Sequence, residues 1–211
     1  MKTRNVAITL EKAKEWYNSD NASLKEIALQ AFNKEELEYN FREITTFKKA
    51  CEALGLSYQR NFNLVIQIAT ISKTSAAMYK LNIVKKALHL GQDLHLTKDP
   101  KDSHIYYPYN PFITTDSTIY NSEIKSGSME IIGKIKNEGA IYYILGGSAY
   151  YGGYTGLGNF DTDDGVGYAM ANIGLLGCAS KEIAQHFSKY FGTLITKAKY
   201  GDMAGFEVCK I

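Results

Sequence analysis

The sequence predicts an α+β protein, in which a helical N-terminal module precedes a mixed domain that closes with a C-terminal helix. Apolar residues recur at helical spacing in residues 9–56, and residues 128–145 alternate as in a β-hairpin. Helical spacing returns after Ser180. The 211 residues suffice for a small module and one domain with its own core, and the 45% hydrophobic fraction is that of an ordinary globular protein.

Residues 1–56 are predicted to form a docking module of three or four short helices. The start and stop signals are Thr9, the capping pair Ser23 and Glu26, the pair Asn33 and Glu36, Thr46, and a C-terminal Gly55. A helix-turn-helix is the alternative, but this stretch has no basic recognition helix. Trp16 is expected in the core of the module.

The middle of the chain is expected to hold one secure helix, over residues 74–90, which Gly91 ends. Its buried face is predicted to carry Ala77, Leu81, Val84 and Leu88. Residues 57–72 fit either a strand or a helix: Phe62, Leu64, Ile66 and Ile68 alternate as in a strand, but a helix is also possible. Residues 104–112 contain two prolines in an aromatic run, which predicts an edge strand or an extended segment.

The last third of the chain is predicted to hold a β-hairpin, a helix and a strand. Residues 128–136 and 140–145 form the hairpin around Asn137-Glu138-Gly139. Ser180 caps the final helix, and residues 206–211 alternate as in a closing strand. The buried stripe of the final helix is predicted to be Ile183, Phe187, Tyr190 and Leu194.

The most unusual composition lies in residues 142–170, the tyrosine/glycine-rich stretch, which hold eight of the 18 glycines and six of the 16 tyrosines. Glycine permits positive φ and tyrosine supplies rigid contact area, a combination typical of a paratope. The apolar runs 141–145 and 173–178 are expected to be buried strands on either side. The predicted ligand-binding residues are Tyr150, Tyr151, Tyr154, Asn159, Asp161, Asp163 and Tyr168. The alternatives are an inert ordered surface loop and an oligomer interface.

Two short sequences in this region carry a resemblance. Gly146-Gly147-Ser148 and Ala171-Asn172-Ile173-Gly174 resemble the end of a C-type-lectin-like domain of the formylglycine-generating-enzyme type, although Ala149 replaces the family's Trp and Leu175-Leu176 its Phe-Arg. The variable proteins of diversity-generating retroelements, including phage tropism determinants, use this fold. The resemblance implies a C-type-lectin-like ligand-binding domain over residues 57–211, with residues 74–90 as a helix packed against its sheet.

The two ends of the chain carry a second resemblance. The sequences ITLEKAKEWYNSDNASLKEIALQAFNKEEL and FREITTFKKACEALGL are similar to the opening of uncharacterised proteins encoded by phages and prophages of gut bacteria. Residues 175–184, LLGCASKEIA, are similar to the strand-then-helix ending of the same proteins. This resemblance implies a phage-associated or virion protein. It implies no catalytic residue.

Charge and cysteine usage exclude several classes of protein. A net charge of +2 gives no basis for binding nucleic acid, and no apolar run is long enough to insert into a membrane. The N-terminus lacks the apolar region of a signal peptide, and Cys51, Cys178 and Cys209 form no CxxC pair. The sequence therefore predicts reduced thiols and synthesis in the cytoplasm, with association to a virion as the phage resemblance implies.

No local signature predicts catalysis, a cofactor or a metal. A Cys178–His186 pair is conceivable, but the apolar neighbours of Cys178 favour a buried thiol. His89 and His95, with Asp93 between them, suggest a metal site, but their spacing supplies neither a helical i, i+4 pair nor a further ligand. These side chains are therefore expected to be solvated at a helix end. The acidic residues from Asn159 to Gly165 approach a calcium loop, but Asp164 interrupts its spacing and Met170 stands where glutamate is needed. We therefore expect a non-catalytic protein that binds a protein or glycan ligand, with homo-oligomerisation left open.

Overall fold

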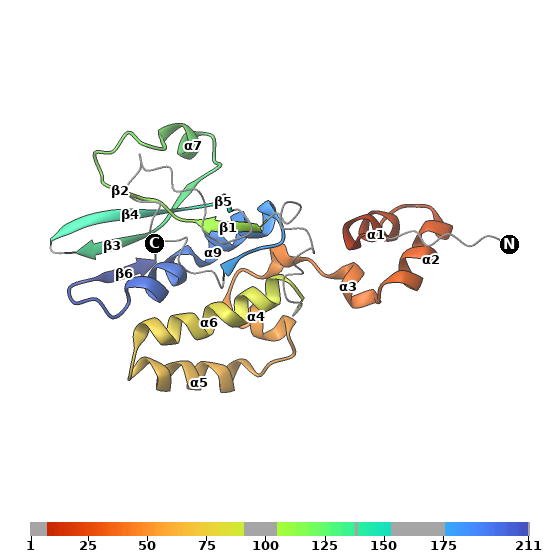
Figure 1. The fold of residues 1–211 in the computed structure, drawn as a ribbon, viewed down its shortest axis with the longest axis horizontal. Helices are drawn as coiled ribbons and strands as arrows, with labels where there is room; N and C mark the ends of the chain where they lie inside the picture. The colour runs from red at the N-terminus through yellow and green to blue at the C-terminus, as the bar shows by residue number, and fades with distance from the viewer. Residues whose placement is uncertain (1–7, 91–104, 138, 153–175, 211) are drawn as a thin grey trace. The chain divides into compact units, whose positions relative to one another are not determined.

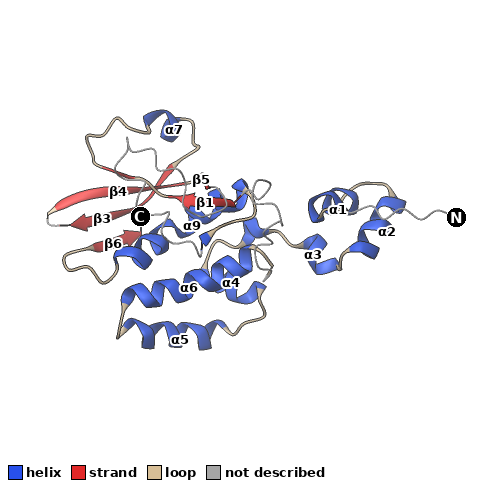
Figure 2. Cartoon of the chain, viewed as in Figure 1, coloured by secondary structure: helices blue, strands red, loops and turns tan. Residues whose placement is uncertain are grey.

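The computed structural model describes residues 8–90, 105–137, 139–152 and 176–210 (Figure 1). The helices are α1 (Leu10–Tyr17), α2 (Ala22–Ala31), α3 (Lys34–Glu38), the 3-10 turn η1 (Phe41–Glu43), α4 (Phe47–Ala53), α5 (Tyr58–Ala69), α6 (Lys73–Leu88), α7 (Asn121–Lys125) and α9 (Lys181–Tyr200). The strands are β1 (Ile105–Tyr109), β2 (Phe112–Ile113), β3 (Glu130–Asn137), β4 (Ala140–Gly146), β5 (Ser148–Gly152) and β6 (Glu207–Lys210) (Figure 2). The predicted α+β class is confirmed.

The chain divides into two compact units, Met1–Asn40 and Phe41–Ile211, and each is described by itself. The boundary predicted after residue 56 lies inside the second unit, because α4 packs against α6 and α5 there. The docking role predicted for the N-terminal helices stays a prediction.

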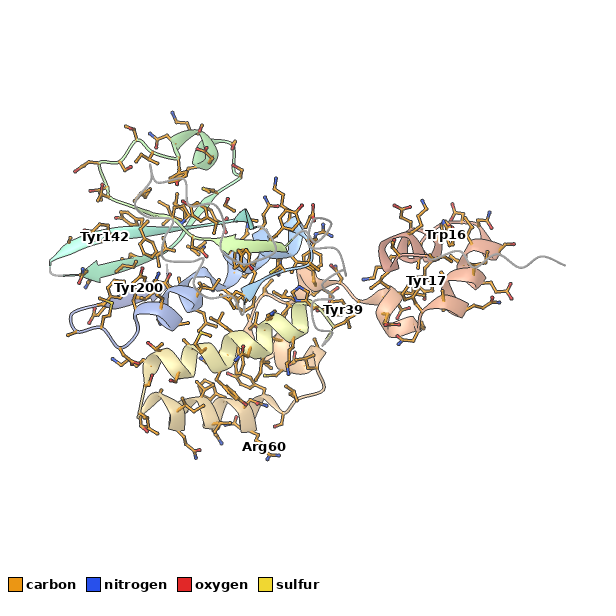
Figure 3. The ribbon with its side chains drawn as sticks, in the orientation of Figure 1. Trp16, Tyr17, Tyr39, Arg60, Tyr142 and Tyr200 are labelled. Atoms are coloured by element: carbon orange, nitrogen blue, oxygen red, sulfur yellow. The ribbon has the colours of Figure 1, made fainter. Side chains whose placement is uncertain are left out.

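The first unit is a group of three short helices. Thr9 accepts a hydrogen bond from the Lys12 N–H (3.3 Å), which confirms it as the cap of α1. Asn33 and Glu36 form a reciprocal capping box, with hydrogen bonds of 3.0 and 2.8 Å. The core consists of Ala13, Ala28 and Leu37, and Trp16 (labelled in Figure 3) packs against it as predicted.

The capping box predicted at Ser23 and Glu26 is wrong. The cap of α2 is Asn21, whose Oδ1 accepts hydrogen bonds from the N–H groups of Ser23 (3.0 Å) and Leu24 (3.2 Å). Asn is as good an N-cap as Ser, so the helix is capped by Asn21, earlier in the chain than predicted.

The second unit begins with a layer of helices. Residues 58–69, which fitted either a strand or a helix, form the amphipathic helix α5. The predicted helix over residues 74–90 is confirmed as α6, but it ends at Leu88, because His89 is its C-cap and Leu90 has a φ of 57°. All four residues predicted for its buried face are buried: Ala77, Leu81, Val84 and Leu88.

Helix α9, and not α6, covers the strands. Helix α6 packs mainly against α9, α5 and α4, whereas α9 contacts β1, β5, β4 and β3. The expectation that residues 74–90 pack on the sheet is therefore wrong, because α9 lies between α6 and the strands. Ser180 caps α9 as predicted, with its Oγ accepting a hydrogen bond from the Ile183 N–H (3.2 Å).

The buried face of α9 differs from the predicted stripe. Phe187 is fully buried, but Ile183, Tyr190 and Leu194 are only partly buried. The buried residues are Ala184, His186, Phe187, Ser188, Phe191, Gly192, Ile195, Thr196 and Ala198. The predicted stripe assumes a helix with one buried side, whereas α9 is covered by α6 on one side and by strands on another.

The strands form two antiparallel sheets. The larger has the order β2-β4-β3-β6, and it contains the predicted hairpin β3–β4 and the predicted C-terminal strand β6. The smaller pairs β1 with β5, so the proline-containing segment is a sheet edge, as expected. Gly133 follows a register shift in β3, and a Cβ there would meet Thr193 Cγ2 of α9 at 2.5 Å. Its lack of a side chain lets the helix approach the sheet.

Asp202 fastens the start of α6 to the chain that follows α9. Its carboxylate accepts hydrogen bonds from the Ser72 hydroxyl (2.5 Å) and the Lys73 N–H (2.7 Å). The Ser72 bond, together with the bonds from the backbone, holds the pKa of Asp202 below its usual range. A lowered pKa means that this contribution to stability is present above about pH 4 and is lost as the pH falls.

Asp202→Asn is therefore expected to lower the urea midpoint of unfolding at pH 7, and to lower it less at pH 3, where the contribution of the wild-type charge is already reduced. Asp116→Asn is the control, because Asp116 is exposed in the turn after β2. An equal difference from wild type at both pH values would show that the carboxylate charge is not responsible.

Candidate functional site

The candidate site is the base of the tyrosine/glycine-rich stretch. The backbone of Tyr150 and Tyr151 lies in β5, which pairs with β1. The other predicted contact residues, Tyr154, Asn159, Asp161, Asp163 and Tyr168, lie outside the described residues, as do His95 and Asp93. What the structure describes is the framework that carries the stretch.

Described residues on either side of segment 153–175 pair with neighbouring residues of β1. Before the segment, Gly152 is the register partner of Ile105. After the segment, Cys178 and Tyr106 form an isolated antiparallel bridge, with N–H···O distances of 2.7 and 3.0 Å. The entry and the exit of the segment therefore meet at the N-terminal end of one strand.

The same pairing brings four tyrosines together in the small sheet. Tyr106 is the register partner of Tyr151, and Tyr107 is the register partner of Tyr150. The Tyr107 side chain is buried and that of Tyr106 is half-buried. The aromatic run of β1 thus lies directly beside the first two predicted contact residues.

Gly146-Gly147-Ser148 is the crossing between the two sheets. Gly146 ends β4 in the larger sheet and Ser148 begins β5 in the smaller one. Gly147 has a φ of +101°, and a Cβ there would meet the Ser128 carbonyl oxygen at 2.8 Å. Only glycine satisfies both demands, which accounts for this element of the sequence independently of any resemblance.

Ser188 of α9 fastens the crossing and the end of β1 to the helix. Its hydroxyl donates to the Tyr109 carbonyl (2.7 Å) and accepts from the Gly147 N–H (3.1 Å). It also accepts from the Asn110 side-chain amide (2.9 Å), so its donor and both of its lone pairs are used.

Asn110 is the second polar residue of this junction and is buried. Its Nδ2 donates to the carbonyls of Leu145 (2.7 Å) and Ser188 (3.0 Å) as well as to the Ser188 hydroxyl. Among the described residues, its Oδ1 has no hydrogen-bond partner. A Cβ on Gly192 would clash with this amide, so glycine at that position makes room for the junction.

Sequence reasoning missed both Asn110 and Ser188. No local pattern marks them, because the two residues lie 78 positions apart and meet only after the strands pack on α9. The contact between Tyr109 and Tyr120 was also not predicted. Their hydroxyl oxygens lie 3.0 Å apart beside the cluster of Ile113, Met129 and Leu145.

His89, the C-cap residue of α6, binds the backbone that follows segment 153–175. His89 Nε2 accepts a hydrogen bond from the Ala179 N–H (3.2 Å), and Nδ1 lies 2.8 Å from the Lys85 carbonyl oxygen. The expectation that His89 is a solvated side chain is therefore wrong, because the chain after Cys178 packs on it. Leu176, Gly177 and Cys178 are buried, but of these three only Cys178 pairs with another strand, as an isolated bridge to Tyr106, so the strand predicted for residues 173–178 is not found in residues 176–178.

Cys178 and His186, the conceivable catalytic pair, are each engaged with a backbone carbonyl. The Cys178 thiol is buried and donates to the Leu176 carbonyl (3.4 Å), and burial raises its pKa to about 12. His186 does not pair with it, since His186 Nε2 donates to the Ile44 carbonyl (2.9 Å). Among the described residues, no three His, Cys, Asp or Glu side chains come close enough to hold a metal ion.

In the described part of the chain, no helix combines the length and the apolar composition needed to cross a bilayer. Comparison with protein-family models, with curated proteins and with solved structures finds no match.

Proposed function

We propose that this is a non-catalytic, phage-associated protein that binds a ligand or receptor through a tyrosine-, glycine- and aspartate-rich surface. The observation that supports the proposal best is the attachment of both ends of segment 153–175 at Ile105 and Tyr106 of one strand. A segment displayed from two adjoining points of a packed sheet is the usual arrangement of binding loops on a rigid scaffold.

Such a base favours ligand binding for an entropic reason. Ordering a long segment costs free energy, and a base that already brings its ends together removes part of that cost before the ligand arrives. The base is held in place before a ligand binds, because hydrogen bonds of Ser188 and Asn110 connect β1, the Gly146-Gly147 crossing and α9. Tyrosine rings then stack on the apolar faces of a sugar or a protein, while carboxylates and amides fix its orientation.

A C-type-lectin-like arrangement of the second unit belongs to the same proposal. It rests on the sequence resemblance and on an antiparallel core sheet with Gly146-Gly147-Ser148 at the entry to the variable-type segment. The alternative function is a structural virion or assembly protein in which the same stretch is an oligomer interface.

The proposal is tested with an array of glycans and with the double variant Tyr154→Ala, Tyr168→Ala. Wild type is expected to bind at least one glycan class, and the double variant to bind it at least about tenfold more weakly, since each lost ring contributes on the order of 1 kcal/mol. Ile71→Ala is the control, because Ile71 is 90% exposed and follows α5, which packs on other helices.

Light scattering after size exclusion separates the two functions. If the binding proposal is correct, wild type and the double variant have the same oligomeric state. A wild-type multimer that the double variant converts to a smaller species supports the oligomer-interface alternative. Failure of wild type to bind any glycan, and any protein displayed by the bacterial host of the encoding phage, would overturn the proposal.

A further inference from the structure

We infer that His89 is a pH-operated latch: its neutral imidazole holds the Ala179 amide on the end of α6, and protonation releases that amide. The inference concerns described residues only and stands whether or not the tyrosine/glycine-rich stretch binds a ligand.

The two hydrogen bonds of the ring fix its tautomer. The Lys85 carbonyl can only accept, so Nδ1, 2.8 Å away, carries the proton and donates. The Ala179 N–H can only donate, so Nε2, 3.2 Å away, offers its lone pair. Only one protonation state of imidazole satisfies both partners, namely the neutral ring with its proton on Nδ1.

Acid therefore affects the two bonds in opposite ways. A proton added to Nε2 turns this acceptor into a donor that faces the donor N–H of Ala179, and that hydrogen bond is lost. The bond from Nδ1 to the Lys85 carbonyl becomes charge-assisted and strengthens. The protonated ring stays with α6, at the helix end that favours a cation, and releases Ala179.

The surroundings move this change to a lower pH than that of an ordinary histidine. Burial is the largest influence and lowers the pKa of His89, the bond to the Lys85 carbonyl raises it, and the Lys85 ammonium lowers it again. On the other side of the ring the titratable group next to Ala179 is Cys178, whose thiol stays protonated. Because the lowered pKa favours the neutral ring in the folded state, the contribution is complete above about pH 6.5 and is lost as the pH falls toward the lower value.

His186 provides an internal comparison. It too is buried with a lowered pKa, of which burial is the largest cause, but its Nε2 donates to the Ile44 carbonyl. Protonation adds a hydrogen to Nδ1 and leaves that bond intact. Of these two histidines, only His89 uses a lone pair to hold another segment.

The latch acts next to one of the two attachments of segment 153–175. Segment 176–180 runs from the end of that segment to the cap of α9, and it is held at Cys178 by Tyr106 and at Ala179 by His89. Release of Ala179 leaves the Tyr106 bridge as the remaining backbone attachment before Ser180.

The test is an NMR pH titration of the full-length protein labelled with ¹⁵N. At pH 7.5 the ¹⁵N shifts of His89 are expected to report a proton on Nδ1 and none on Nε2. As the pH falls, the Ala179 amide shift is expected to follow the midpoint of the His89 ring and not that of His186. Below that midpoint, Ala179 hydrogen exchange, corrected for its intrinsic pH dependence, is expected to accelerate about fivefold to tenfold.

Two variants complete the test. In His89→Ala the Ala179 amide is expected to exchange rapidly at every pH and to lose its titration, whereas in His186→Asn it keeps the wild-type midpoint. A proton on Nε2 at pH 7.5, a His89 ring that stays neutral down to pH 4, or an Ala179 amide that does not follow His89 would each overturn the inference. The wild-type measurements decide this even if a variant does not fold.

Discussion

Truncation of Ile144 or Leu145 to alanine is expected to lower the free energy of unfolding by about 2–5 kcal/mol, because each loses methyl groups from a closed core. Both side chains are 0% exposed, and they belong to two separate clusters on opposite faces of β4. Tyr154→Ala and Tyr168→Ala are expected to change the same free energy by no more than about 0.5 kcal/mol, as for exposed side chains that meet only a partner. Chemical denaturation with urea measures all four.

The matched control is Ile141→Ala, in the same strand. Ile141 is 44% exposed, so the same chemical change opens no closed cavity and is expected to cost less than about 1 kcal/mol. If the two tyrosine variants lose as much stability as Ile144→Ala, their rings are part of the core. The binding proposal would then lose its chemical basis, whatever the array shows.

The elements that could be predicted are those whose signals are local. A cap such as Thr46 or Ser180 bonds a backbone N–H three residues later, so the interaction is written within one turn of the chain. The β3–β4 hairpin is equally local, since Asn137 pairs with Ala140. Where two caps compete, as Asn21 and Ser23 do, local signals do not decide between them.

The features that could not be predicted depend on partners far along the chain. The buried face of α9 depends on α6 and on strands β1, β3, β4 and β5, which lie outside the helix's own sequence. Which side chains of α9 turn inward follows from both sets of contacts. His89 was assigned to solvent because Ala179, 90 positions later, is invisible to any local pattern. Of the seven predicted contact residues, the structure describes the backbone of Tyr150 and Tyr151, so the contact surface itself stays a prediction.

The junction of Ser188 and Asn110 shows why such a feature matters for the site. Each partner of the Ser188 hydroxyl comes from a different element: Tyr109 from β1, Gly147 from the crossing, and Asn110 from the turn between β1 and β2. Removing one oxygen atom therefore leaves three polar groups short of a hydrogen bond at once. A buried group left without its partner costs about 1–3 kcal/mol, and Asn110 keeps two other acceptors.

Ser188→Ala is accordingly expected to lower the free energy of unfolding by about 2–3 kcal/mol, although it deletes only a hydroxyl. Thr196→Val is the matched control in the same helix. It also deletes a buried hydroxyl and keeps the volume, but the Thr196 hydroxyl donates only back to the Gly192 carbonyl of its own helix (2.9 Å). Its loss is expected to cost less than about 1 kcal/mol, because that carbonyl lies within the hydrogen-bonded part of α9.

Hydrogen exchange shows whether the larger stability loss expected for Ser188→Ala than for Thr196→Val comes from the crossing. In Ser188→Ala the Gly147 amide is expected to exchange faster relative to the β3–β4 ladder, because its acceptor has been removed while the ladder keeps its own bonds. Thr196→Val leaves the Gly147 amide as in wild type. If Ser188→Ala and Thr196→Val cost the same and Gly147 exchange is unchanged, the hydroxyl does not hold the crossing, and the base of the tyrosine/glycine-rich stretch is positioned by the strand pairing of β1 and β5 alone.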